Sequence, residues 1–144
     1  NGKGVEKLRK AGIEVETGIL EKKAKKLNEK FIYSMSAGKP FIGLKIAMTL
    51  DGKIADYESN SKWITTIEAR KKAHYIRSGY SAILAGGETI RIDDPQYTVR
   101  HVKGNNPYRI ILTKGGNIPP ESQILINQDN KTLFLTNNKE LKKK

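Results

Sequence analysis

Residues 81–100 read SAILAGGETIRIDDPQYTVR, and this stretch decides the fold class. A short apolar run over 81–87 ends in two glycines, which is typical of a buried strand that passes directly into a turn or a short helix. Pro95 closes that turn or helix. The runs YRIILT at 108–113 and KTLFLT at 131–136 predict two further strands.

A helix is predicted between residues 66 and 78, ahead of the first of these strands. Thr65 and Glu68 have the spacing of a capping box, and Gly79 has the place of a helix C-cap. Strands therefore alternate with helices along the chain. This order predicts an α/β fold with a largely parallel sheet.

The residues ahead of Gly38 form a separate group of predicted elements. A helix is expected over 4–12, a short strand over 13–19 and an amphipathic helix over 20–35, with its lysines mostly opposite the apolar face. The SAGKP sequence that follows is the best boundary in the chain.

The stretch KPFIGLKIAMTLDGKIAD, residues 39–56, predicts a strand over 41–50 that ends in an Asp51-Gly52 turn. Alternation gives this strand a core face, formed by Ile42, Leu44, Ile46, Met48 and Leu50. The opposite face is small or polar beyond Phe41 and carries Lys45. That lysine either points into a binding site or lies solvated on an edge strand.

Composition limits the classes of function. The 144 residues carry 27 Lys and Arg against 15 Asp and Glu, a net charge of +12, and no cysteine. Disulfides and thiolate metal sites are therefore excluded, and a cytoplasmic origin is expected. No apolar run is long enough to span a membrane, and the first residues lack a secretory h-region and an initiator Met. We therefore expect the chain to begin inside a longer protein.

The basic surplus indicates either a polyanionic partner or solvated lysine-rich faces. Arginines are the better evidence for phosphate recognition, and Arg70, His74 and Arg77 share one face of the predicted helix. Arg77 and Arg100, from separate elements, are candidates to converge on one dianion. The Gly86-Gly87 pair is either a phosphate-binding turn or a plain turn. No metal-ligand cluster is visible in the sequence.

Four motifs occur in order: LKIAMTLDGKIA, SKWIT, AR…H…R and AILAGGETIRIDDPQYTVR. Together they resemble the reductase domain of the bifunctional riboflavin-biosynthesis deaminase/reductase family, strongly over about 40–101 and loosely over 107–136. Residues 1–38 are similar to the last strand and helix of that family's deaminase domain. The resemblance therefore implies two parts, a deaminase remnant over 1–38 and the N-terminal part of a reductase domain over 39–144.

The resemblance implies a dihydrofolate-reductase-like, three-layer α/β fold with a mostly parallel sheet, here incomplete, after the end of a cytidine-deaminase-like domain. It implies NADPH-dependent reduction of the ribosyl group of 5-amino-6-(5-phosphoribosylamino)uracil to a ribityl chain. The expected partner is this phosphorylated pyrimidine, with no nucleic acid and no membrane, in a homodimer. Zinc belongs only to the family's deaminase domain.

The resemblance also implies roles for individual residues. The cofactor-contacting positions are Ala47, Trp63, Thr89 and Asp93, with Gly86 and Gly87 near the cofactor phosphates. The substrate-contacting positions are Ser61, Arg77, Tyr97 and Arg100, and Tyr97 stands where the family has Leu. Lys45 falls where a polar group approaches the carbonyl of the opened sugar, as a charge or a proton donor.

Two departures from the family pattern bear on activity. The chain has no cysteine, so the deaminase zinc motif is absent, and the family's reductase domain continues well beyond residue 144. Exposed strand edges, incomplete core burial and self-association are therefore expected. Two alternatives stay open at this point, a basic nucleic-acid-binding α/β module and a structural fragment without activity.

Overall fold

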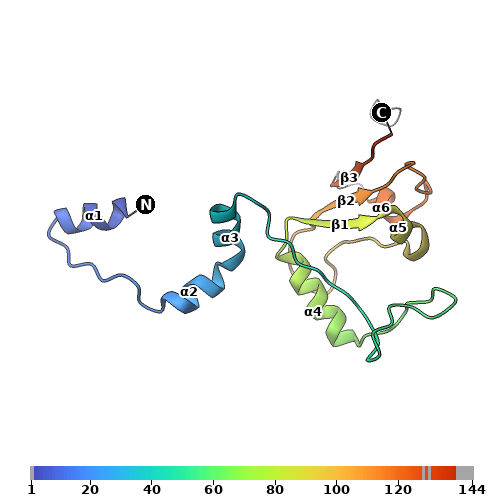
Figure 1. The fold of residues 1–144 in the computed structure, drawn as a ribbon, viewed down its shortest axis with the longest axis horizontal. Coiled ribbons are helices and arrows are strands. Elements are labelled where there is room, and N and C mark those ends of the chain that lie inside the picture. The colour runs from blue at the N-terminus through green and yellow to red at the C-terminus, as the bar shows by residue number, and fades with distance from the viewer. Residues whose placement is uncertain (1, 128, 130, 139–144) are drawn as a thin grey trace. The chain divides into compact units, whose positions relative to one another are not determined.

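The computed structural model describes residues 2–127, 129 and 131–138 (Figure 1). It divides into two compact units, Asn1–Ile46 and Ala47–Lys144. No helix among the described residues has the length and apolarity that crossing a membrane requires.

The first unit contains the helices α1 (Lys3–Lys10), α2 (Glu21–Leu27) and α3 (Glu29–Ala37). The predicted helix over 4–12 is confirmed as α1. The single helix expected over 20–35 is interrupted at Asn28, whose side chain donates a hydrogen bond back to the Ala24 carbonyl at 3.0 Å. An asparagine side chain that bonds to nearby backbone competes with the helical pattern, which explains the interruption.

Two predicted strands are wrong. Residues 13–19 and 41–50 form no strand, and the expected core face of the second is exposed, with Leu44 85% and Leu50 108% accessible. A strand exists only where a neighbour completes its hydrogen bonds, and no described segment pairs with either one. The predicted turn is present, because Gly52 has φ 82° and its N–H donates to the Thr49 carbonyl at 3.0 Å.

The second unit is built on a parallel sheet of β1 (Ala82–Gly86), β2 (Tyr108–Leu112) and β3 (Thr132–Leu135), in that spatial order. The three strands expected from the sequence are thus confirmed. Figure 1 shows their arrows running in the same direction. Their carboxyl ends therefore meet at one edge of the sheet.

The helices of this unit are α4 (Ile67–Ser78), α5 (Gly87–Asp93) and α6 (Gln123–Ile126). The cap of α4 is Thr66 rather than Thr65, because the Thr66 hydroxyl accepts the Ala69 N–H at 3.2 Å. The predicted C-cap, Gly79, is confirmed. The sequence did not predict α6, because four residues are too few to show a helical period.

Three isoleucines form the buried core: Ile90 of α5, Ile111 of β2 and Ile124 of α6. Both short helices therefore cover the same face of the sheet. The opposite face carries Leu84, Leu112 and Leu133, which are 46–61% exposed. Core burial in the described part of the chain is incomplete, as the sequence predicted.

Candidate functional site

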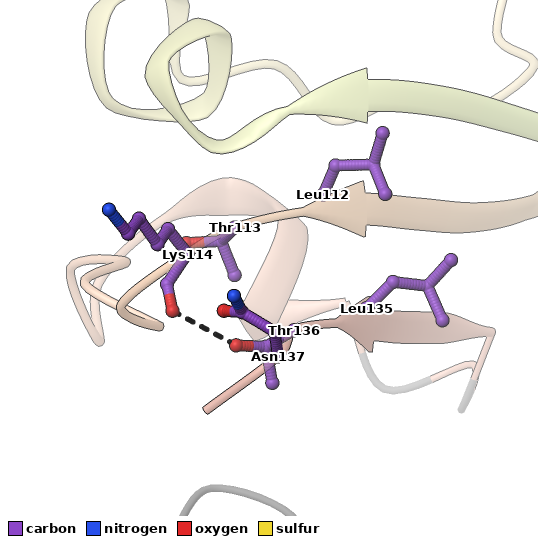
Figure 2. A pocket seen from close by; sticks show the side chains of 6 residues that line it. All are labelled: Leu112, Thr113, Lys114, Leu135, Thr136 and Asn137. Atoms are coloured by element: carbon purple, nitrogen blue, oxygen red, sulfur yellow. Dashed lines mark hydrogen bonds between the residues drawn. The ribbon is translucent and has the colours of Figure 1, made fainter. Parts of the chain in front are cut away.

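The carboxyl edge of the sheet carries an open pocket of about 460 Å³ (Figure 2). It lies where β2 and β3 end, and the Thr136 hydroxyl donates to the Lys114 carbonyl at 3.1 Å across it. Ligands of open parallel sheets bind outside the carboxyl ends of the strands. The lining residues are Leu112, Thr113, Lys114, Leu135, Thr136 and Asn137.

Gly86, the last residue of β1, and Gly87, the first of α5, lie at the same edge but have different surroundings. A Cβ on Gly87 would lie 3.2 Å from the Thr113 side chain, whereas a Cβ on Gly86 would meet no atom within 4 Å. Because glycine has no side chain, Gly87 lets α5 begin close to the end of β2. Packing accounts for Gly87 without a ligand, so the pair alone does not indicate a phosphate site.

Ser61 and Asp93 meet although 32 positions separate them. The Ser61 hydroxyl donates to the Asp93 carboxylate at 3.4 Å, in a partly buried place. Asp93 is the last residue of α5. The bond therefore brings the segment that leads into α4 against the end of α5, and it joins a residue predicted to bind substrate to one predicted to bind cofactor.

Trp63 is held by an arginine of α4. The Arg70 guanidinium lies 4.1 Å from the centroid of the Trp63 ring and donates to the Thr65 carbonyl at 3.1 Å. The tryptophan is nevertheless 72% exposed. It therefore offers a large aromatic surface whose orientation is supported by a cation–π contact.

Arg77, two turns further along α4, reaches the segment that follows α5. Its guanidinium donates to the Thr98 carbonyl at 2.6 Å and lies 5.9 Å from the centroid of the Tyr97 ring. Burial lowers the Arg77 pKa, and the nearby Arg100 lowers it further. An arginine nevertheless stays charged at neutral pH, so Arg77 presents a partly buried cation.

Tyr97 has two environments. It packs against the isoleucine core and has φ 49°, in the left-handed region that non-glycine residues rarely adopt. Burial raises its pKa, the Asp93 carboxylate raises it further, and Arg77 opposes both. The phenol is therefore neutral at physiological pH, and the ring supports Arg77 from the core side.

Arg100 is exposed and is held at both its main chain and its side chain. Its guanidinium donates to the side-chain oxygen of Gln96, and its main-chain N–H donates to Nδ1 of His74 at 3.2 Å. Within the described residues neither Arg77 nor Arg100 forms an ion pair with a carboxylate. The two arginines thus form a positively charged site without a carboxylate counter-ion in the described part of the chain.

The predicted helix face divides between two places. Arg70 contacts the Trp63 ring, whereas His74 and Arg77 contact residues of the segment 97–100. Thr89 lies partly buried in α5. Ala47 is partly buried at the first position of the second unit, and Lys45 is exposed in the first unit. The cofactor, substrate and catalytic roles of all the residues expected from the resemblance remain predictions, those of Lys45, Ala47 and Thr89 included.

Sequence reasoning missed the polar residues just after β2 and β3, above all Thr113, Lys114 and Thr136. The available signal was their position, since the residue after each parallel strand lies at the same edge as Gly86. It also missed Gln96, which holds Arg100 and donates to Gln123 at 3.1 Å. Among the described residues, no three His, Asp or Glu side chains gather as a metal site would require.

Comparison with known proteins identifies the family. The family model of the RibD C-terminal domain matches residues 40–144. The riboflavin biosynthesis protein RibD of Aquifex aeolicus is 45% identical over 137 residues, which cover 94% of this chain and 38% of that protein. RibD of Synechocystis is 42% identical over 135 residues and is covered to 37%. The chain therefore spans about two fifths of the length of these relatives.

Solved structures agree with the fold. A diaminohydroxyphosphoribosylaminopyrimidine deaminase/5-amino-6-(5-phosphoribosylamino)uracil reductase of Thermotoga maritima superposes with a TM-score of 0.87 at 44% identity, covering 96% of this chain and 40% of that one. Acinetobacter baumannii RibD gives 0.84 at 38% identity, covering 97% and 41%. The α/β fold expected from the resemblance, of the dihydrofolate-reductase-like reductase type, is confirmed. The chain belongs to the RibD C-terminal domain family.

Proposed function

We propose that this chain is part of an NADPH-dependent reductase of riboflavin biosynthesis, which converts the ribosyl group of 5-amino-6-(5-phosphoribosylamino)uracil to the ribityl form. Membership of the RibD C-terminal domain family supports the reaction class. The observation that carries the proposal is the pair Arg77 and Arg100, two cations that α4 and residues 98–100 hold on one short segment, without a carboxylate partner in the described chain.

The arginine pair suits the phosphate of the substrate. Two guanidinium groups from separate elements offer several donors to a dianion. Holding the two cations near each other is unfavourable until an anion is present, as the effect of Arg100 on the Arg77 pKa indicates. Ser61 and Tyr97 complete the proposed substrate side, with the Ser61 hydroxyl oriented by Asp93.

The residues present also fit a dinucleotide. The exposed Trp63 ring offers a stacking surface, and the pocket at the carboxyl edge of the sheet carries the cationic Lys114. We assign the cofactor to Trp63, Asp93, Thr89 and Ala47, with Gly86, Gly87 and Lys114 towards its phosphates. The bound cofactor would supply the hydride, and the protein would orient the two reactants.

Lys45 remains the candidate for stabilising negative charge on the sugar carbonyl oxygen as it is reduced, or for donating a proton to it. NADPH rather than NADH, the homodimer, the cytoplasmic location and the division at residues 38/39 into a deaminase remnant and a reductase part belong to the same proposal. Zinc would be bound only by a deaminase domain with the cysteine motif that this chain lacks.

Steady-state kinetics of the complete gene product tests the proposal. Arg77→Ala and Arg100→Ala should each raise the KM for the phosphorylated substrate by roughly tenfold or more, because a charged hydrogen bond is lost. The affinity for NADPH should stay within about twofold in both variants. Lys71→Ala, an exposed cation on the same helix, is the control for loss of charge alone.

Two results would contradict the proposal. A wild-type protein that does not oxidise NADPH with this substrate would refute the activity. An unchanged KM in both arginine variants would refute the phosphate site while leaving the activity in place.

A further inference from the structure

We propose that His74 is a positioning residue, which sets the place of Arg100 by accepting the main-chain N–H of Arg100 on its neutral ring. This inference rests on the proposed function, because it assigns His74 to the support of the substrate-phosphate site. His74 is 5% exposed and belongs to α4, and no direct contact with substrate is assigned to it.

The geometry joins one helix to one short segment at two points. His74 Nδ1 accepts the Arg100 N–H at 3.2 Å, and Arg77 donates to the Thr98 carbonyl at 2.6 Å. The two helix residues lie three positions apart, about one turn, so both project from the same side of α4. His74 accepts one bond and Arg77 donates the other, and together they fix the register of residues 98–100 along α4.

The ring of His74 has a defined proton arrangement. Because Nδ1 accepts a hydrogen bond, the proton of the neutral imidazole lies on Nε2. The ring of His101 packs against it edge to face, with 4.6 Å between the centroids. Burial lowers the His74 pKa to about 4; the charges of Arg77, His101 and Arg100 contribute in the same direction, and a hydrogen bond with the Thr98 backbone opposes them. A neutral acceptor therefore supports Arg100 without adding a third positive charge.

A lysine or arginine at position 74 would repel the arginine pair, and an aliphatic residue would leave the Arg100 N–H without its acceptor. Loss of the His74 hydrogen bond should act on Arg100 in particular, because His74 fixes the main chain from which the Arg100 side chain extends. Loss of the bond should therefore affect recognition of the phosphate more than turnover.

The test compares His74→Leu, which removes the acceptor, with His74→Asn, whose amide oxygen can replace Nδ1. Both are made in the complete gene product, with Lys71→Leu as the control on the same helix. KM and kcat are measured for the phosphorylated substrate and for the same compound without its phosphate. His74→Leu should raise the KM for the phosphorylated substrate by roughly tenfold. We expect kcat and the KM for the dephosphorylated compound to stay within about twofold, and His74→Asn to restore most of the loss.

An unchanged KM in His74→Leu overturns the inference, as does equal impairment of the Leu and Asn variants. Wild-type protein that shows no reductase activity, or no preference for the phosphorylated compound, refutes the proposed function instead. If His74→Leu does not fold, ¹⁵N NMR of histidine-labelled wild-type protein decides the question. A neutral His74 with its proton on Nε2 supports the inference, and one with its proton on Nδ1 overturns it.

Discussion

The Ser61 hydroxyl donates a hydrogen bond to the Asp93 carboxylate at 3.4 Å, across 32 positions of sequence. Ser61 precedes α4 and Asp93 ends α5, so this contact joins a proposed substrate residue to a proposed cofactor residue on two separate segments. A substitution of either residue should therefore alter the position of the other.

A double-mutant cycle measures this link. We expect Ser61→Ala and Asp93→Ala each to lower kcat/KM, and their combination to cost less than the sum. A long hydrogen bond predicts a coupling of about 0.5–1 kcal/mol. Steady-state kinetics of the four proteins gives the value, and the pair Ser61→Ala with Lys71→Ala should be additive. Strict additivity of Ser61 and Asp93 would show that the contact has no energetic effect.

Arg70 should control the orientation of the Trp63 ring. Arg70→Ala removes the guanidinium 4.1 Å from the ring centroid, and an exposed cation–π contact contributes about 0.5–1 kcal/mol. We expect a rise of about two- to fivefold in the KM for NADPH, with partial recovery in Arg70→Lys because lysine lacks the planar group. Acrylamide quenching of Trp63 fluorescence, corrected with Trp63→Phe protein, reports the ring directly. Lys72→Ala should change neither quantity.

The fully buried Arg109 side chain of β2 depends on Asp129. Arg109 donates two hydrogen bonds to the Asp129 carboxylate and one to the Thr132 hydroxyl at 2.9 Å. Asp129→Ala leaves a buried cation unpaired and should lower the free energy of unfolding by roughly 2–3 kcal/mol, since the 24% exposure of Asp129 reduces the full penalty.

Arg109→Met should cost less than Asp129→Ala, because it removes the charge and keeps apolar volume in the core. Urea unfolding compares the two, with the exposed Glu121→Ala as the control for loss of a carboxylate. A larger cost for Arg109→Met would contradict the assignment of the penalty to an unpaired cation.

His74 and Asp129 should make the free energy of unfolding depend on pH in two separate ranges. The His74 pKa of about 4 lies below its ordinary value of 6.5, mainly through burial. The unfolded chain therefore binds more protons between these values, so stability falls as the pH drops from about 6.5 to 4. The Arg109 hydrogen bond lowers the Asp129 pKa from 3.8 to about 2, so its contribution is lost as the pH falls from about 4 to 2.

Urea unfolding across pH separates the two windows. His74→Asn should flatten the upper window, and Asp129→Ala the lower one. A wild-type dependence that both variants retain unchanged would assign the loss of stability to other groups.

Gly104 lies against α4 and should not accept a side chain. A Cβ at this position would lie 2.6 Å from the Cβ of Ser78, so Gly104→Ala should lower stability by about 1–3 kcal/mol through overpacking. Adding Ser78→Gly should recover part of the loss. Gly115→Ala meets no atom within 4 Å and should be neutral or slightly stabilising. Thermal unfolding of the four proteins checks the order.

Local patterns in the sequence predicted most of the second unit. The apolar runs of β1, β2 and β3 and the pattern of α4 are properties of consecutive residues, and the ordered motifs identified the family. The capping residue was misplaced by one position, because Thr65 and Thr66 are chemically equivalent and only the backbone conformation selects Thr66.

The sequence by itself determined which segments alternate, which family they resemble and which arginines are available. Only the tertiary structure decided that Arg70 contacts Trp63, whereas Arg77 and His74 form hydrogen bonds with residues 98–100. It also placed Lys114 at the same edge of the sheet as Gly86. It also decided that the apolar alternation at 41–50 forms no strand. The physical reason is that strand formation, burial and electrostatic pairing depend on partners distant in sequence, which a local pattern does not contain.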